Sequence, residues 1–264
     1  MHIVEELITE RAQKLMARPK LWRVMQPAAY KMLGYDQAVL MADAVRPLTG
    51  RQAFDYMSGV LKVRPRITGL EHIPNSGPAI IISNHPTGLA DGVFVFDALK
   101  APRPDHIFMA NADALRVIPQ CEDIIIPVEW VKAKRTPAKT RQTLSAMKSA
   151  IAAQQAIVIF PSGVLAHLTR KGLTDKAWNP TAISMARKHG VPIVPLKINS
   201  RNSVLYYVLS GLNGELRDIT LFRELLNKKG QCPTLTFGAP INPETLPRNT
   251  KQATQAVRDI VEKL

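Results

Sequence analysis

At 264 residues, this chain is long enough for one sizeable α/β domain with an extension. Its 46% hydrophobic and 21% charged residues are close to the average of folded soluble proteins, which excludes a disordered chain and a polytopic membrane protein. The formal net charge of +14 is unusual, and it implies attraction to nucleic acid, an anionic membrane surface or an acidic carrier protein. Because only Cys121 and Cys232 occur, we expect neither a disulfide framework nor a cysteine-based zinc site.

The N-terminal region has a helical pattern from Ile3 to about Val63. Within it, the stretch KLWRVMQPAAYKML mixes basic and aromatic residues on an apolar helix. This mixture is typical of an interfacial membrane helix, and an ordinary packing helix looks the same. Pro27 is expected to kink or divide this helix. We therefore treat 1–63 as an amphipathic helical region with a candidate role in membrane association.

The chain begins with acidic residues where a secretory signal would have a basic start and an unbroken apolar core. This beginning favours a cytoplasmic location. The longest strongly apolar segments, such as VLYYVLSGL from Val204 to Leu212, are well short of the roughly 20 residues that span a bilayer. We expect a protein that lies on a membrane and does not cross it.

After Val63, short apolar runs alternate with helical stretches. This alternation predicts an α/β fold over 64–264, with a mostly parallel central sheet flanked by helices. A last helix is expected from about Thr250 to Leu264. The expected strands are RITGL, AIIIS, HIFMA, DIIIPV, AIVIF, IVPLKI and TLTFG.

Polar residues follow three of these expected strands. Open α/β sheets bind ligands outside the carboxyl ends of their strands, so residues at these positions are candidate site residues. They are Asn84 and His85 after AIIIS, Pro161, Ser162 and Gly163 after AIVIF, and Arg201, Asn202 and Ser203 after IVPLKI.

The stretch SNHPTGLADG contains the candidate catalytic pair His85 and Asp91. An imidazole is a suitable general base near neutral pH, and a carboxylate on its other nitrogen fixes the tautomer and stabilises the imidazolium. Pro86 and Gly88 favour a turn that brings the two side chains together. The alternative is a buried strand, a polar turn and a helix in which His85 only completes its hydrogen bonds, and the spacing alone does not separate these two interpretations.

Three segments, SNHPTGLADG, IFPSG and HGVPIVPLKINSRNS, together resemble blocks of the glycerolipid acyltransferase superfamily, in the family's order and over about Arg66 to Ile241. This superfamily includes 1-acylglycerol-3-phosphate O-acyltransferases, and the chain also looks like its bacterial branch of hemolysin-named proteins, which includes aminolipid O-acyltransferases. The resemblance implies an acyltransferase domain at 64–264 that moves a fatty acyl group from acyl-CoA or acyl-carrier protein to a hydroxyl of a lysophospholipid or lyso-aminolipid. It implies His85 as general base and Asp91 as the residue that steadies it.

The sequence departs from the family pattern at three places. His85 and Asp91 enclose five residues where the commonest pattern has four. The family's Phe-Pro-Glu-Gly-Thr-Arg appears here as FPSGVL, without the acid. The family's Gly and Arg after the next strand have no clear match near DIIIPVEWVKAKR. The missing acid favours an acceptor other than a phosphate-bearing glycerol.

The candidate substrate-binding residues are Asn84, the residues Pro161, Ser162 and Gly163 after AIVIF, and the residues Arg201, Asn202 and Ser203 after IVPLKI. Backbone N–H groups near Pro161 to Gly163 are the candidate donors to an oxyanion. Arg201 has the alternative of a surface salt bridge. Trp178 is expected to pack in the core. The segment VLYYVLSGL is left without a role. A basic face toward lipid or carrier is expected from Arg170, Lys171, Lys132, Lys134 and Arg135.

Two other functions compete with acyl transfer. A lipid esterase or thioesterase would use Ser162 or Ser83 as nucleophile with His85 and Asp91, although the Gly-x-Ser-x-Gly elbow is missing. A nucleic-acid-binding protein would use the charge of +14, but no helix-turn-helix, zinc finger or RNA-binding aromatic signature accompanies it.

The expected partners are therefore an anionic membrane surface, a lysolipid acceptor and acyl-CoA or acyl-carrier protein, without nucleic acid. We expect no metal, because the histidines are scattered without a ligand motif, and no cofactor besides the acyl donor as cosubstrate. The expected location is cytoplasmic and peripheral, on the inner face of the cell membrane.

Overall fold

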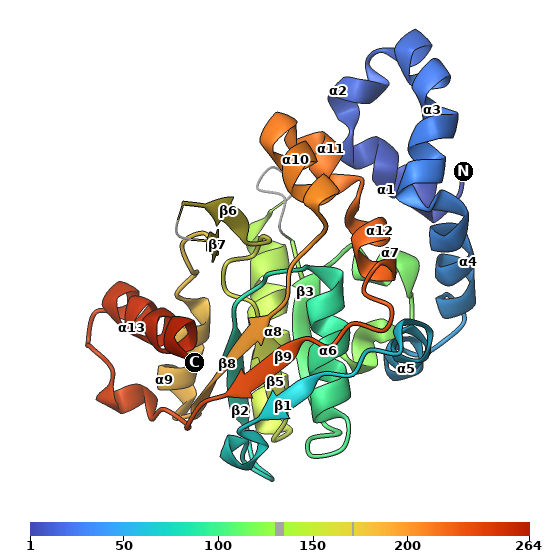
Figure 1. The fold of residues 1–264 in the computed structure, drawn as a ribbon. Coiled ribbons are helices and arrows are strands. Elements are labelled where there is room, and N and C mark those ends of the chain that lie inside the picture. Colours follow the sequence, from blue (N-terminus) through green and yellow to red (C-terminus); the bar gives the residue numbers. More distant parts are fainter. Residues whose placement is uncertain (130–134, 171) are drawn as a thin grey trace.

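A computed structural model describes residues 1–129, 135–170 and 172–264 of the protein. It has one central sheet with helices on both faces (Figure 1). Among these residues the sheet has seven strands in the order β1-β9-β8-β2-β5-β3-β4. Neighbouring strands are parallel except for β8 and β9, which are antiparallel. The predicted α/β fold with a mostly parallel sheet is therefore confirmed.

Each expected strand segment lies in this sheet. The strands are β1 Arg66–Thr68, β2 Ala79–Ser83, β3 Ile107–Asn111, β4 Ile125–Val128, β5 Ala156–Ile159, β8 Ile193–Asn199 and β9 Thr234–Phe237. A separate antiparallel hairpin, which the sequence patterns did not indicate, is formed by β6 His167–Thr169 and β7 Gly172–Thr174. With three residues in each strand, the hairpin is too short for a readable alternation of apolar and polar side chains.

Strand β2 lies at the centre of the core, and all five of its residues are buried. Its side chains alternate, because Ala79 and Ile81 join the cluster on one face of the sheet while Ile80 and Ile82 join the other. The first face is covered by α5 Gly50–Leu61 and α6 Leu89–Leu99, and the second by α8 Pro137–Ala152, α9 Thr181–His189 and α13 Thr250–Lys263.

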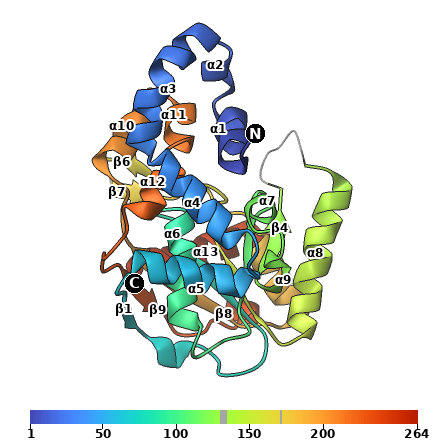
Figure 2. The same ribbon diagram turned by 90° about the vertical axis from the view of Figure 1, so that its right-hand side faces the viewer.

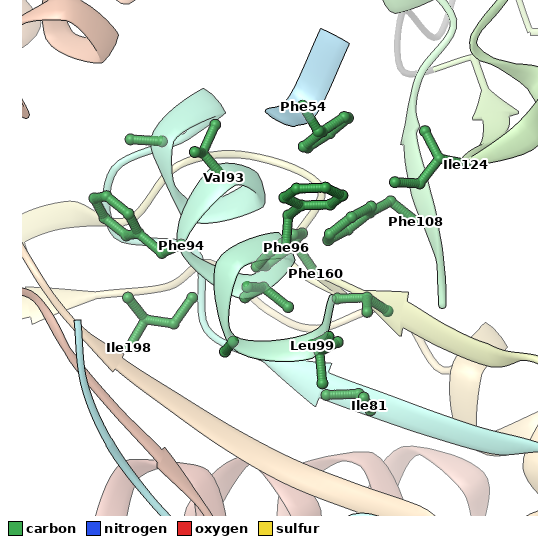
Figure 3. Packing of buried hydrophobic residues seen from close by; sticks show 14 of the residues in the cluster. Phe54, Ile81, Val93, Phe94, Phe96, Leu99, Phe108, Ile124, Phe160 and Ile198 are labelled. Atoms are coloured by element: carbon green, nitrogen blue, oxygen red, sulfur yellow. The ribbon is translucent and has the colours of Figure 1, made fainter. Parts of the chain in front are cut away.

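Aromatic rings fill the first face. Phe54 of α5 lies 5.2 Å from the ring of Phe96 in α6 and 5.3 Å from that of Phe108 in β3 (Figure 3). Phe160, directly after β5, belongs to the same cluster. The core on this face therefore reaches the carboxyl end of β5, where the site begins.

The predicted helical region at the N-terminus is also confirmed. It contains α1 Ile3–Arg11, α2 Gln13–Met16, α3 Pro19–Leu33 and α4 Tyr35–Val45, followed by α5. Residues of α1, α3 and α4 share a hydrophobic cluster with α11 Gly214–Asp218 and α12 Leu221–Leu226, although these two helices come much later in the sequence (Figure 2). By contrast, α5 packs on the sheet through Phe54 and Leu61. The boundary at residue 63 between the N-terminal helical region and the following α/β domain stays a prediction.

Helix α3 is continuous across Pro27, so of the two expected effects the proline does not divide the helix, and a kink stays a prediction. Proline removes one N–H from the helical ladder, and the remaining bonds of a 15-residue helix still hold it together. No helix of the described ranges combines the length and apolar character that a membrane crossing needs. The remaining short elements are α7 Ala114–Val117, α10 Val204–Leu212, η1 Leu70–His72, η2 Cys121–Asp123 and η4 Pro243–Thr245.

Candidate active site

The side chains of His85 and Asp91 meet at the carboxyl end of β2. The strand ends at Ser83, and α6 begins at Leu89 after the turn that contains Gly88. Asp91 lies in the first turn of α6 and reaches back, so that its Oδ2 is 3.0 Å from Nδ1 of His85. The five intervening residues therefore do not prevent the pairing. The contact is a close electrostatic pair, because Nδ1 has no aligned hydrogen-bond partner among the described residues.

The carboxylate of Asp91 is fully buried and held by the turn itself. Its Oδ2 accepts hydrogen bonds from the backbone N–H groups of Thr87 at 2.8 Å and Gly88 at 2.9 Å, and its Oδ1 accepts one from the Thr87 hydroxyl. Such donors at a helix N-terminus favour a negative charge. Gly88 has a φ of +82°, and a Cβ there would be 3.0 Å from Cδ2 of Leu165, so the turn needs a glycine at this position.

His85 is held on three sides. Its ring stacks on Phe160 with a centroid distance of 4.4 Å, and its carbonyl oxygen accepts a hydrogen bond of 2.9 Å from the N–H of Ala166. Its own N–H donates to Oδ1 of Asp175 at 3.2 Å. Because Nδ1 is buried against Asp91 while 18% of the side chain is exposed, Nε2 is the ring nitrogen available to a substrate.

Asp175 connects a second part of the sequence to this arrangement. Its Oδ2 accepts a hydrogen bond of 2.9 Å from Nε1 of Trp178, whose ring lies in the core as expected. Burial raises the pKa of Asp175, although the hydrogen bonds from Trp178 and His85 oppose the shift. The segment GLTDKAWNP therefore positions the backbone of His85.

The segment FPSG lies beside His85 through Phe160. The carbonyl oxygen of Pro161 accepts a hydrogen bond from Asn179, and the Ser162 hydroxyl donates to the carbonyl oxygen of Val164 at 2.7 Å. The N–H of Gly163 is engaged by the carbonyl oxygen of Phe160 at 3.1 Å. Since proline has no N–H, Ser162 keeps the remaining backbone donor of the three predicted residues.

Among the described residues, neither candidate nucleophile is hydrogen-bonded to His85. The Ser162 hydroxyl is directed to Val164, and the buried hydroxyl of Ser83 donates to Oδ1 of Asn84 at 3.4 Å. A serine nucleophile requires a hydrogen bond to its base, which the described residues do not provide here. The geometry therefore gives the hydrolase alternative no support.

Asn84 joins two neighbouring strands. Its Nδ2 donates to the carbonyl oxygen of Ile198 at 2.9 Å, and its Oδ1 accepts from the N–H of Ile198 at 2.8 Å. Its amide thus fastens the end of β2 to β8 next to His85. Contact between Asn84 and substrate stays a prediction.

The predicted residues 201–203 follow β8, the neighbour of β2 in the sheet. Arg201 is exposed, while Asn202 is only 5% exposed and has no partner for either atom of its amide among the described residues. Ser203 caps α10, since its hydroxyl accepts from the N–H of Tyr206. Within the described ranges, no hydrogen bond joins 201–203 to His85 or Asp91.

A buried ion pair beside this segment was missed by the sequence analysis. Glu224 accepts hydrogen bonds from the N–H of Ser203 at 2.7 Å and from its hydroxyl at 2.6 Å, and Lys228 Nζ lies 3.5 Å from Oε2 of Glu224. Burial opposes the charge of Glu224, but the hydrogen bonds from Ser203 and Asn227 and the charge of Lys228 outweigh it, so the pKa of Glu224 is lowered. Burial also lowers the pKa of Lys228, which the Glu224 and Asp91 carboxylates oppose. The four-residue spacing of Glu224 and Lys228 was the signal for an ion pair in the sequence, but this spacing does not indicate that the pair is buried.

A cavity of about 230 Å³ adjoins the site. Phe160 and Pro161 line it on the side of His85, and Leu144 and Lys139 line it on the side of α8. Arg135, one of the residues expected on a basic face, also lies at this cavity, while Lys132, Lys134 and Lys171 are outside the described residues. The cavity therefore lies next to Phe160, whose ring stacks on His85.

Two curated relatives and one solved structure are similar to this chain. The chain is 26% identical to the lyso-glycine lipid O-acyltransferase of Phocaeicola vulgatus, over 77% of this chain and 74% of the relative. It is 22% identical to the protein of the same name from Bacteroides thetaiotaomicron, over 93% and 96%. The crystal structure of the 1-acyl-sn-glycerophosphate (LPA) acyltransferase PlsC from Thermotoga maritima aligns with a TM-score of 0.49 and 16% identity, over 99% of this chain and 90% of that one.

A family model described as acyltransferase matches residues 64–199, which include His85, Asp91 and the FPSG segment. This range is more than half of the chain. The chain therefore belongs to the acyltransferase family, and the protein is an acyltransferase.

Proposed function

We propose that this acyltransferase moves a fatty acyl group from a thioester to a hydroxyl of a lysolipid, with a lyso-aminolipid of the glycine-lipid kind as its acceptor. The observation that carries the proposal is the His85–Asp91 pair, 3.0 Å apart at the carboxyl end of β2 and inside the range that the family model matches. The names of the two curated relatives support the acceptor class.

In this mechanism, Nε2 of His85 takes the proton of the acceptor hydroxyl while its oxygen attacks the thioester carbonyl carbon. Asp91 stabilises the imidazolium that forms. When the tetrahedral intermediate collapses, the C–S bond breaks and the proton passes from Nε2 to the thiolate. The products are an ester and a free thiol, and no acyl-enzyme forms.

The intermediate carries an oxyanion that needs hydrogen-bond donors. We assign this role to the N–H of Ser162, because the N–H of Gly163 is already bonded to Phe160 and Pro161 has none. Phe160 links this donor to the catalytic ring, since it stacks on His85 at 4.4 Å.

The acceptor head group is assigned to the residues after β8. The buried amide of Asn202 offers one unpaired donor group and one unpaired acceptor, and leaving both unpaired is costly. A head group with an amide and a carboxylate, such as an acylated glycine, satisfies Asn202 and places its charge near the exposed Arg201.

The proposal extends to the donor and the place of action. The net charge of +14 attracts the acidic carriers and phosphates of acyl-carrier protein and acyl-CoA as well as an anionic membrane. We therefore propose a peripheral enzyme on the inner face of the cell membrane.

A panel assay tests this function. Purified protein is given acyl-CoA or acyl-carrier protein with lyso-glycine lipid, other lyso-aminolipids or lysophosphatidic acid, and products are identified by mass spectrometry. Transfer to lyso-glycine lipid is expected, and faster transfer to lysophosphatidic acid would overturn the acceptor assignment. The Ser162→Ala variant keeps its turnover within about tenfold, since its backbone N–H remains, whereas a lost serine nucleophile costs far more.

Two variants test the head-group site. Asn202→Ala is expected to raise KM for the acceptor about tenfold or more, because a buried polar partner is lost. The matched control is Asn199→Ala, which removes an exposed amide from the last residue of β8, three residues before Asn202. Equal KM values in the two variants would remove Asn202 from the acceptor site.

A further inference from the structure

Helix α10 exposes a stripe of large apolar side chains. Val204 is 79% exposed, Val208 53% and Leu212 73%. They are four residues apart and therefore lie on one side of the helix. We call these three residues the α10 stripe. The helix contains no charged residue, and Tyr206 is its only buried side chain, on another side. An apolar segment of this kind is expected in a core, so its exposure requires an explanation.

The α10 stripe is anchored to both the site and the N-terminal helices. Ser203, which caps α10, is bonded to the buried Glu224 and follows Asn202 directly. At the other end, Glu215 of α11 accepts hydrogen bonds from the N–H groups of Lys14 and Leu15 in α2. Helix α10 is therefore fixed in place and is not a loose segment.

More exposed apolar side chains lie on segments next to the His85–Asp91 pair. They come from the segments that hold His85: Leu89 at the start of α6, 49% exposed, Val164 after FPSG, 43%, and Leu168 in β6, 64%. Strands β5 and β8 both run parallel to β2, so the β6–β7 hairpin after β5 and α10 after β8 follow the same edge of the sheet as His85. Figures 1 and 2 show the hairpin below α10.

Exposed arginines lie near the α10 stripe. Arg201 is exposed three residues before Val204, and Arg170 is exposed directly after β6. The nearby acids are engaged, since Glu215 binds α2 and Asp218 pairs with Arg217 at 2.7 Å. Apolar side chains with flanking cations fit an anionic lipid surface, whereas a second copy of this chain would bring like charges together.

From these observations we propose that α10 lies flat in the surface of an anionic bilayer, with Val204, Val208 and Leu212 among the acyl chains. Its nine residues extend over about 13 Å, which suits an in-plane helix. This inference rests on the proposed function in one respect: the bilayer is the source of the lysolipid, and α10 leads from it to residues 201–203. The docking itself is independent of the acyl acceptor.

Vesicle binding tests the proposal. The variant Val204→Ser/Val208→Ser/Leu212→Ser is compared with wild type by co-sedimentation with vesicles of phosphatidylcholine and phosphatidylglycerol. Because all three side chains are exposed, the variant is expected to fold, which circular dichroism checks. Its vesicle affinity should fall at least about tenfold. The matched control, Ile260→Ser, removes an exposed apolar side chain of α13 and should bind as wild type does.

A second measurement places the helix in the membrane. In a Cys232→Ser background, where the remaining Cys121 is buried, Val208→Cys carries an environment-sensitive fluorophore. Vesicles should shift its emission to the blue, and lipids brominated on their acyl chains should quench it. Equal vesicle affinity of the triple variant and wild type would overturn the proposal. A blue shift that appears without vesicles and depends on protein concentration would also overturn it, because it would show that a second copy of the chain covers α10.

Catalysis separates this inference from the proposed function. With a short-chain acceptor below its micelle concentration, the triple variant should turn over as wild type does, while its rate on vesicle-embedded acceptor falls about tenfold or more. If wild type binds vesicles through α10 but transfers no acyl group, the function fails and the docking surface stands.

Discussion

Replacing Asp91 by Asn tests how the carboxylate assists His85. The change keeps the size of the side chain but removes its charge. The amide oxygen can occupy the position of Oδ2, which accepts from the N–H groups of Thr87 and Gly88. The amide NH₂ then faces the Thr87 hydroxyl, which can rotate to accept a hydrogen bond. The fold should therefore survive, with a loss in the free energy of unfolding of about 1–2 kcal/mol.

The expected effect on catalysis follows from the distance. At 3.0 Å and an effective dielectric constant of about 20, an imidazolium and a carboxylate attract each other by about 5 kcal/mol. His85 is 18% exposed, so solvent screening reduces this energy, and we take about 4 kcal/mol. Since 1.4 kcal/mol corresponds to about tenfold, kcat should fall about a thousandfold.

The assay is steady-state acyl transfer with both substrates varied. For Asp91→Asn, kcat should fall while KM for the acceptor changes little. The matched control is Asp97→Asn, the same change in the same helix at a side chain bonded to Ser58 and Lys100, for which kcat should stay near that of wild type. A kcat of Asp91→Asn within about threefold of wild type would refute the assisting role of the carboxylate.

Three further predictions concern buried groups and the turn. Burial lowers the pKa of His106 to about 4. As the pH falls from about 6.5 towards 4, only the unfolded state therefore takes up a proton on this side chain. The free energy of unfolding should fall by about 2–3 kcal/mol from pH 7 to about 4.5. Denaturant titrations of wild type and His106→Asn check this, and equal pH slopes would contradict it. Glu224→Leu should lower the free energy of unfolding by about 3–5 kcal/mol, because the buried charge of Lys228 loses the carboxylate it pairs with. The double variant Glu224→Leu/Lys228→Met should lose less, and a double variant no more stable than the single one would argue against this pair. Gly88→Ala should lower the melting temperature, because the φ of +82° and the contact with Leu165 strain an alanine there. It should also lower kcat, because this turn holds Asp91. An unchanged kcat would show that catalysis does not need the turn.

The sheet was predictable because its strands are buried and rich in β-branched residues. Residues 79–82 form a continuous apolar run, and its short length and β-branched residues are typical of a buried strand in a parallel sheet. The polar residues after it then follow from the rule that sites form at carboxyl strand ends, which placed His85 in the candidate site. The pairing with Asp91 was also predictable, because Pro86 and Gly88 indicate a turn.

The remaining features depend on tertiary contacts that local patterns do not carry. The amide of Asn84 is used between β2 and β8, 114 residues apart, so its bonds to Ile198 are not visible in the sequence. Glu224 and Lys228 read as an ordinary surface pair of a helix end until the fold buries them. VLYYVLSGL has the composition of a core helix, and only the structure shows that Val204, Val208 and Leu212 are exposed.

The most direct test of the central claim is acyl transfer by wild type and by His85→Ala, measured as the O-acylated lipid and the free thiol formed from an acyl thioester and lyso-glycine lipid. We predict one ester for each thiol released by wild type, and a rate at least about a hundredfold lower in the variant with acceptor binding retained. Free fatty acid in place of the ester, or a variant rate within about tenfold of wild type, would contradict the account of His85 as the general base of an acyltransferase.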